Sequence, residues 1–304
     1  MELRRLRFLR EFEVRGTLGA VAAALGYSPS AVSQQLALLE KEVGAQLLEK
    51  AGRGVRLTDA GRILAGHAGV LLAAADAAAA DLAAHTDEVR GTVRASGLQS
   101  AARRLLVPAV ARIAAAFPGI RAEVFELEVE EALPELRLGA VDLLISDEYD
   151  GHPRPRQAGL RFAVLHAEEL KLVLPAAHPL AASGGPVPIT ALRDEAWVAT
   201  GASTGHHAMV VGTCRSLGGF DPDLRHLCYD AEVQLELVRR AGAVALLPEL
   251  TLPAGDPAVA VRDVAEQSLG RRLFVVTRDG PRAPALTTFL AVLTDVASSL
   301  GDSV

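Results

Sequence analysis

Cysteine and aromatic residues are scarce in this chain. Its 304 residues include two cysteines, Cys214 and Cys228, and aromatic side chains make up 4% of the total. Two cysteines are too few for a disulfide scaffold, and the sequence holds no paired His/Cys cluster with the spacing of a metal site. We therefore expect neither a metal nor another cofactor.

Long apolar runs are also missing, although half of the residues are apolar. The N-terminal segment MELRRLRFLREF has no apolar core of signal-peptide length, and no later run approaches the roughly 20 residues of a membrane span. The chain carries no H-E-x-x-H motif, and no Lys-Ser/Thr pair follows Gly201 and Gly205 as in a phosphate-binding loop. We therefore expect a cytoplasmic protein that is not an enzyme and has no membrane partner.

The stretch from Leu18 to Thr58 is the most informative part of the sequence. Apolar residues at 18, 21, 22 and 25 share one face of a short helix, and Gly26-Tyr27 breaks the pattern. Ser28 is a predicted N-cap, and Pro29 suits the first position of the next helix. The buried stripe of that second helix is predicted at Val32, Leu36 and Leu39.

The exposed face of the second helix carries short hydroxyls and carboxamides, and its first acid is Glu40. Such a face suits insertion into the major groove of DNA, because Gln bonds adenine edges in pairs and Ser bonds bases or phosphates. An ordinary solvated helical hairpin is the alternative. The predicted DNA-contacting residues here are Ser28, Ser30, Ala31, Ser33, Gln34 and Gln35.

A basic segment interrupted by glycines follows, from Lys50 to Leu57, and suggests a hairpin wing. Lys50, Arg53 and Arg56 are predicted to lie along the phosphate backbone; a solvated surface turn is the alternative. Residues 1–62 hold ten Lys/Arg against seven acids, a net +3, whereas the whole chain carries −6 and the remainder therefore −9. The local basic excess coincides with the motif.

These motifs, in this order, resemble the DNA-binding domain of LysR-type transcriptional regulators. The resemblance covers residues 1–62 and rests on residues 18–25, SPSAVSQQLALLEKEVG (28–44), QLLEK (46–50) and RGVRLTDAGR (53–62). Ser30 stands where the family often has Pro, and Leu48 stands where it commonly has Phe. The resemblance implies an all-α winged helix-turn-helix domain, residues 1–58, that binds double-stranded DNA at an imperfect palindrome.

Residues 59–88 are predicted to form one long, Ala-rich helix with an apolar stripe. At about 1.5 Å per residue it would reach roughly 45 Å, and such a face needs a partner. The segment matches the family's linker helix, which implies a homodimer or homotetramer. Packing on the chain's own effector domain is the alternative.

From residue 91 onward, strand-like and helix-like segments alternate, which indicates a parallel α/β sheet. The predicted elements include a helix at 105–117, a strand at 141–145 and a strand at 169–174. Short matches at 91 (GTVR), 117 (FPGI), 138 (LGAVDLLI) and 241 (AGAVALLPE) resemble the family's α/β two-lobed, periplasmic-binding-protein-like effector domain.

The effector domain is predicted to span 91–304. Lobe one would take 91–165 and 267–304, and lobe two 166–266, with hinges near 165–168 and 263–267.

Ligands in open α/β sheets bind beyond the carboxyl ends of strands, against helix N-termini. The loops at 99–101, 200–204 and 229–230 occupy such places, and their hydroxyls and amides favour carboxylates or similar anions. N-capping is the alternative role for these side chains. The predicted effector-binding residues are Gln99, Ser100, Ala101, Thr200, Ser203, Thr204 and Asp230.

Together these features predict a sequence-specific DNA-binding transcription regulator whose activity responds to a small-molecule effector held between two lobes. A solute-binding protein without DNA contact is the alternative, but it would have no use for residues 1–62. Some family members sense peroxide through a cysteine pair, so a redox role for Cys214 and Cys228 stays open beside the commoner inert state. Trp197, in a predicted Val/Ala strand, is expected to pack in the core.

Overall fold

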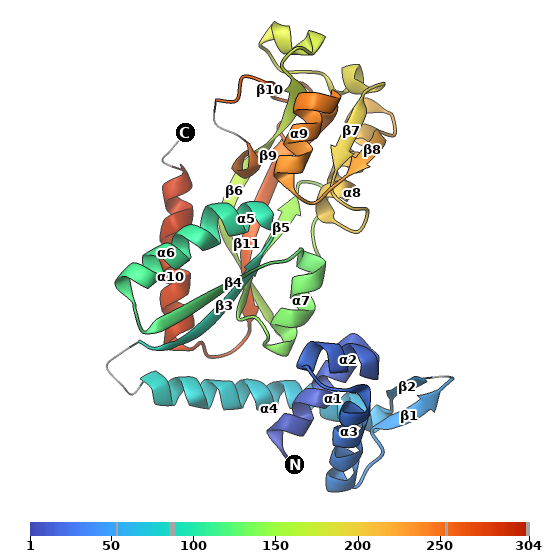
Figure 1. Cartoon of the computed structure of the whole chain (residues 1–304), viewed down its shortest axis with the longest axis vertical. Coiled ribbons are helices and arrows are strands. Elements are labelled where there is room, and N and C mark those ends of the chain that lie inside the picture. The colour runs from blue at the N-terminus through green and yellow to red at the C-terminus, as the bar shows by residue number, and fades with distance from the viewer. Residues whose placement is uncertain (53, 85–88, 253–254, 302–304) are drawn as a thin grey trace. The chain divides into compact units, whose positions relative to one another are not determined.

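A computed structural model describes residues 1–52, 54–84, 89–252 and 255–301 (Figure 1). The chain divides into two compact units, the first built mainly from residues 1–90 with the short segments 137–140 and 280–287, and the second from the rest of residues 91–304. Among the described helices, none combines the length and the apolarity needed to cross a membrane.

The first unit comprises three helices, a two-stranded antiparallel hairpin and a long fourth helix. Its elements are α1 (Leu3–Arg15), α2 (Leu18–Leu25), α3 (Pro29–Val43), β1 (Leu48–Ala51), β2 (Gly54–Leu57) and α4 (Asp59–Ala84). Leu9 and Phe12 of α1 pack with Val32, Leu36 and Leu39 of α3 in one apolar core. The predicted buried stripe of the second helix is thereby confirmed.

Local hydrogen bonds set the ends of α2 and α3. The Ser28 side chain accepts from the Ala31 N–H at 3.2 Å, and Pro29 takes the first helical position, as predicted. Gly26 ends α2 with a φ of +70°, a conformation that suits glycine because it lacks a Cβ. The turn between the two helices therefore follows directly from the Gly-Tyr-Ser-Pro order.

The hairpin is tied to the end of α3. The carboxylate of Glu40 accepts hydrogen bonds from the N–H groups of Leu47 and Leu48, at 2.7 and 2.9 Å. Thr58 caps α4 by accepting from the Gly61 N–H at 3.0 Å. A Cβ at Gly61 would lie 2.2 Å from the Leu47 carbonyl oxygen, so the close approach of α4 to the residue just before β1 requires glycine. The predicted helix over 59–88 is described as far as Ala84, and 85–88 lie outside the described residues.

The second unit alternates strands and helices around one sheet. Its elements are β3 (Gly91–Gly97), α5 (Gln99–Ala101), α6 (Val107–Ala116), β4 (Ile120–Glu126), α7 (Val129–Leu138), β5 (Leu143–Tyr149), β6 (Leu160–Pro175), β7 (Ala196–Ala199), α8 (Gly205–Thr213), β8 (Asp223–Leu227), α9 (Ala231–Ala241), β9 (Val244–Pro248), β10 (Val259–Arg262), β11 (Gly270–Arg278) and α10 (Pro284–Gly301). Turns of π-helix continue α5 and α8, at Ala102–Leu106 and Cys214–Gly218.

The sheet is mixed, and the expectation of a parallel sheet is wrong for its centre. The strand order is β4-β3-β5-β11-β6-β9-β7-β8, with β10 beside β6. The pairs of β3 with β4 and β5, and of β7 with β8 and β9, are parallel, whereas β11 and β6 pair antiparallel with their neighbours. β5 and β6 are not neighbours, because β11, from the C-terminal part of the chain, lies between them and runs antiparallel to both.

Three further boundaries differ from the predictions. The helix expected at 105 already begins at Gln99, and the strand expected at 141–145 is β5, residues 143–149. Only the second half of β6, from Glu169, was expected. Its first half contains the apolar run FAVL at 162–165, but its exposed and half-buried positions do not alternate regularly, and it is paired along its length with β11.

β6 connects the two lobes of the sheet. Its residues 160–169 pair with β11, and its residues 170–175 pair with β9 or β10. Leu273 pairs with His166 and Phe274 with Val164, so Leu165 is an extra residue, a bulge of the kind that bends a strand. This bulge lies at the predicted 165–168 crossover.

Trp197 is fully buried in the core of the second lobe, as expected. It lies on β7 and its indole Nε1 donates to the Leu192 carbonyl at 3.1 Å. Met209 and Cys214, which follow along α8 and the π-helical turn, belong to the same cluster. The strand that leads into the 200–204 loop is therefore held by apolar packing.

Candidate DNA-binding surface and effector pocket

The exposed face of α3 has the composition expected of a DNA-reading helix. Ser30, Ser33 and Gln34 are exposed, opposite the fully buried stripe. The hydroxyls of Ser28 and Ser30 lie 2.9 Å apart. These side chains share one solvent-facing surface near the N-terminus of α3, which is the geometry that major-groove insertion requires.

Two other predicted residues of α3 are placed differently. Ala31 is half-buried, and the Gln35 carboxamide oxygen accepts from Arg5 Nε of α1 at 3.4 Å. Arg5 also pairs with Glu42 near the end of α3. Gln35 thus takes part in the packing of α1 against α3, and its contact with DNA stays a prediction.

The wing residues are only partly described. Lys50 and Arg56 are exposed on β1 and β2, whereas Arg53 lies outside the described residues. Arg56 pairs across the hairpin with Glu49 at 2.8 Å. An exposed ion pair of this kind is weak, so Arg56 can exchange Glu49 for a phosphate at little cost.

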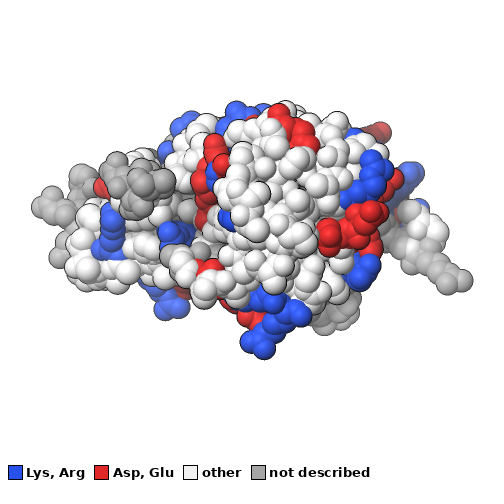
Figure 2. All heavy atoms as spheres, turned by 90° about the horizontal axis from the view of Figure 1, so that it is seen from above, with Lys and Arg blue, Asp and Glu red and all other residues white. Residues whose placement is uncertain are grey.

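Ion pairs also occur on the surface of the second unit. Figure 2 views the molecule of Figure 1 from above. It shows acidic and basic side chains close to one another around a broad area without charged side chains. Examples of such exposed pairs in the second unit are Arg215–Asp221 and Arg225–Asp223. Pairing of this type leaves little uncompensated charge on the surface.

A pocket that is partly open to solvent lies in the second unit and is lined from both lobes. Gln99 and Ser100 reach it from α5, and Thr200 reaches it from the segment after β7. Three predicted ligand residues therefore meet at one pocket. The other lining residues are Leu98, Glu128, Asp147, Tyr149, Arg154, Gly205, His206, Tyr229, Ala231, Gln234, Leu247, Pro248, Thr251 and Arg271.

The remaining four predicted ligand residues are not among those lining this pocket. Ala101 and Thr204 are buried, while Ser203 and Asp230 are exposed. Thr204 contacts the pocket indirectly, because its hydroxyl bonds that of Thr200. Direct ligand contact by these four residues stays a prediction.

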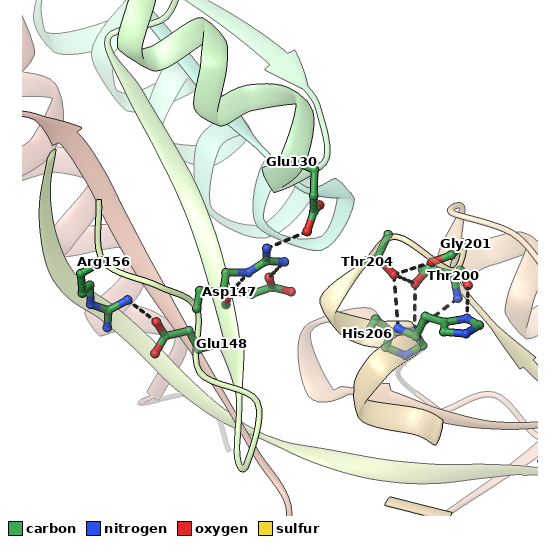
Figure 3. Close-up of polar contacts among 10 residues, drawn as sticks. Glu130, Asp147, Glu148, Arg156, Thr200, Gly201, Thr204 and His206 are labelled. Atoms are coloured by element: carbon green, nitrogen blue, oxygen red, sulfur yellow. Dashed lines mark hydrogen bonds and ion pairs between the residues drawn. The ribbon is translucent and has the colours of Figure 1, made fainter. Parts of the chain in front are cut away.

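A hydrogen-bonded group surrounds the start of α8 (Figure 3). Thr204 accepts from the His207 N–H at 3.2 Å and donates to the Gly201 carbonyl at 2.9 Å. His206 Nε2 lies 2.9 Å from the Leu246 carbonyl, and burial lowers the His206 pKa to about 4. His206 is therefore neutral at pH 7, with Nε2 as the donor and Nδ1 free to accept from the Thr200 N–H at 3.4 Å.

Residues 201–205, Gly-Ala-Ser-Thr-Gly, also fit the G-x-S-x-G pattern of serine hydrolases. In the described part of the chain Ser203 has no hydrogen bond to a histidine. His206 bonds the Leu246 carbonyl, and His207 Nδ1 lies 3.2 Å from the Thr200 carbonyl. The sequence match therefore lacks the base that would activate a nucleophile.

The start of α9 is capped from both lobes. Asp230 accepts from the N–H groups of Glu232 and Val233, at 2.7 and 3.3 Å. Gln99 Oε1, from the other lobe, accepts from the Ala231 N–H at 2.8 Å, and a hydrogen bond from Gln99 is the main cause of the lowered pKa of Asp230. The N–H groups at the start of α9, which were expected to bind an anion, therefore donate to side chains of the protein itself. The His207 N–H at the start of α8 does the same.

Both arginines that line the pocket are bonded to carboxylates. Arg154 donates to Glu130 at 2.6 Å and to Asp147 at 3.1 Å (Figure 3). Arg271 Nε donates to Glu168 at 2.8 Å. The sequence did not indicate these groups, because Glu130 and Glu168 are far from their arginines in the chain and no local motif marks Asp147, 7 residues before Arg154.

The two described units together define a class of protein in which a helix-turn-helix DNA-binding domain is joined to a two-lobed ligand-binding domain. Residues 3–62 match the family described as bacterial regulatory helix-turn-helix protein, lysR family, and residues 86–298 match the LysR substrate binding domain. The chain therefore belongs to the LysR family of transcriptional regulators.

Relatives in this family differ in what they regulate. A probable hydrogen peroxide-inducible genes activator of Mycobacterium avium is 38% identical over 62% of this chain and 58% of the relative's own length. The transcriptional dual regulator GltC of Bacillus subtilis is 27% identical over 86% of this chain and 85% of its own. The match thus spans little more than half of the first relative.

Solved structures show the same fold. A full-length OxyR variant from Pseudomonas aeruginosa has a TM-score of 0.69 at 19% identity, covering 98% of this chain and 94% of that one. Full-length CbnR complexed with its target DNA has a TM-score of 0.57 at 20% identity, covering 97% and 100%. At these identities the likeness establishes the fold alone.

Proposed function

We propose that this regulator reads a specific DNA site through α3 and β1–β2 and changes its activity when a small molecule occupies the pocket described above. One observation carries the proposal: the pocket is lined from both lobes, and Gln99 of one lobe bonds the Ala231 N–H of the other. A ligand in this place contacts both lobes and can change how they are held together. Binding to chromosomal DNA implies a cytoplasmic location.

At the DNA, the exposed face of α3 supports a division of labour. Ser30, Ser33 and Gln34 would face base edges, and Lys50, Arg53 and Arg56 would contact phosphates. A two-fold symmetric dimer presents two copies of α3, which suits an imperfect palindrome.

Self-association is proposed to involve α4. Ile63, Val70 and Leu82 expose 65%, 67% and 75% of their surfaces on this helix. Apolar side chains so exposed along one long helix are typical of an interface with a second copy, in a homodimer or homotetramer. Sedimentation of the full chain tests this, and a monomer at micromolar concentration would contradict it.

Footprinting on the DNA upstream of the protein's own gene tests the main proposal. We expect a protected imperfect palindrome whose protection pattern changes when a ligand binds the pocket. Gln99→Ala should keep the palindrome but alter the response to ligand, whereas Arg225→Ala, at an exposed position outside this pocket and the predicted hinges, should match wild type. A ligand that binds the pocket and leaves the footprint unchanged would contradict the switching role.

A further inference from the structure

The pocket contains a buried hydrogen-bond acceptor that is left without a donor. Gln234, on α9, lines the pocket and is only 2% exposed. Its Nε2 donates to the Cys228 carbonyl at 2.7 Å, which identifies Oε1 as the remaining acceptor. Among the described residues, Oε1 has no hydrogen-bond partner. A buried polar atom without a partner is costly, so a donor on a bound molecule would be favoured there.

A carboxylate on the same pocket is also without a direct partner. Glu128, directly before α7, lines the pocket and is half-buried, and no described group forms a hydrogen bond or ion pair with its side chain. Arg154 attracts it electrostatically, but that guanidinium is bonded to Glu130 and Asp147. Glu128 is therefore a second acceptor that faces the pocket without a donor.

The charges around the pocket add up to an excess of acid. Its lining holds Glu128 and Asp147 against Arg154 and Arg271. Each arginine is bonded to a further carboxylate, Glu130 or Glu168, so the group comprises four acids and two bases. His206 does not change this balance, because burial keeps it neutral. An anion would find no unpaired cation among the described lining residues.

We propose that the effector is a small organic cation of the amine class, whose N–H donors are shared by the Glu128 carboxylate and Gln234 Oε1. This inference rests on the proposed role of the pocket as the effector site. Tyr149 and Tyr229 also line the pocket, and aromatic rings stabilise cations at short range. The expectation of an anionic effector relied on open helix N-termini, which Thr204, Asp230 and Gln99 occupy in the structure.

The same geometry predicts how affinity depends on pH. Burial, Asp147, Glu130 and Glu131 raise the pKa of Glu128 to about 7, against the opposing attraction of Arg154. An ammonium group favours the ionised carboxylate, and free amines stay charged well above pH 7. Amine affinity should therefore rise between pH 6 and pH 8 as Glu128 loses its proton.

Calorimetry on the full-length protein tests the inference with three matched probes: 1,4-diaminobutane, butane-1,4-diol and succinate. We expect the diamine alone to bind, with an affinity that rises with pH. Glu128→Gln should weaken it by roughly tenfold or more and flatten the pH dependence. Glu126→Gln, which removes an exposed acid outside the pocket two residues before Glu128, should stay within about twofold of wild type.

The outcomes separate this inference from the proposed function. Failure of the diamine to bind at millimolar concentration, or equal binding to wild type and Glu128→Gln, would overturn the amine assignment. Succinate or the diol could instead bind, with Thr200→Val abolishing that binding. This result would exclude the amine class but keep the pocket as the effector site. A ligand that alters the footprint but is insensitive to both Glu128→Gln and Thr200→Val would remove the pocket itself from the mechanism.

Discussion

Replacing Arg271 tests how strongly the two lobes depend on one buried ion pair. Arg271 and Glu168 have side chains that are 2% and 1% exposed, and Arg271 Nη2 also donates to Ser100 at 2.9 Å. Arg271→Met preserves much of the volume but leaves Glu168 buried without its cation. Removing one partner of a buried pair costs about 3–5 kcal/mol, so we expect a loss of unfolding free energy of that size.

Urea and thermal denaturation followed by circular dichroism measure this loss. At about 2–4 °C per kcal/mol, the melting temperature of the second unit should fall by roughly 6–20 °C. Adding Glu168→Gln should recover part of the loss, because Gln is neutral and still accepts from the Leu250 N–H that Glu168 holds at 2.7 Å. In the matched control Arg225→Met, which breaks an exposed pair with Asp223, the cost should stay below about 1 kcal/mol. Equal losses in Arg271→Met and the control would refute the reasoning.

Three further predictions concern DNA and redox chemistry. Gln34→Ala should cost roughly 1–3 kcal/mol at the cognate site and little on random DNA in fluorescence anisotropy; equal losses on both would exclude base reading. Arg56→Ala should weaken binding to all sequences alike and lower the salt slope by about one unit, and an unchanged slope would exclude a phosphate contact. Burial raises the pKa of Cys214 to about 12 and also raises that of Cys228, so both thiols stay protonated at pH 7. Peroxide should then leave DNA affinity unchanged, and a peroxide-induced Cys214–Cys228 disulfide seen by mass spectrometry would contradict this.

The elements that could be predicted from the sequence are those with local signals. Ser28-Pro29 and the stripe at Val32, Leu36 and Leu39 mark α3 because capping and helical periodicity act within a few residues. The start of α9 also carries a local signal, because Asp230, predicted as a ligand residue, caps its first turn. Such signals place an element but do not determine how distant elements pair.

The features that could not be predicted depend on contacts between distant segments. The first part of β6 is half-exposed, and it joins the second part as one strand because β11 pairs along it. The ion pair of Arg271 and Glu168 joins residues 103 positions apart, and the bond from Arg154 to Glu130 spans 24. The sequence therefore indicated the loops around the pocket but not its charge, because the charged groups come from segments whose arrangement in space was unknown.

The single tryptophan offers a way to follow ligand binding in solution. Trp197 is fully buried on β7, three residues before Thr200, which lines the pocket and bonds Thr204. Most of its core cluster belongs to its own lobe, Tyr149 and Leu269 excepted, and its Nε1 donates to Leu192 of the same lobe. Movement of the lobes should therefore not expose the indole to solvent. A bound ligand should instead change its emission through the segment that leads to Thr200.

We therefore expect a ligand that binds by calorimetry to shift Trp197 emission while quenching by acrylamide stays the same. Thr200→Val should reduce the emission change, because it removes the hydroxyl that links the pocket to Thr204. Ser183→Ala is the control, since Ser183 is exposed and does not line the pocket. A large rise in acrylamide quenching on ligand binding would show that the Trp197 core itself opens. In that case the two lobes would not move as rigid units around the bulge in β6.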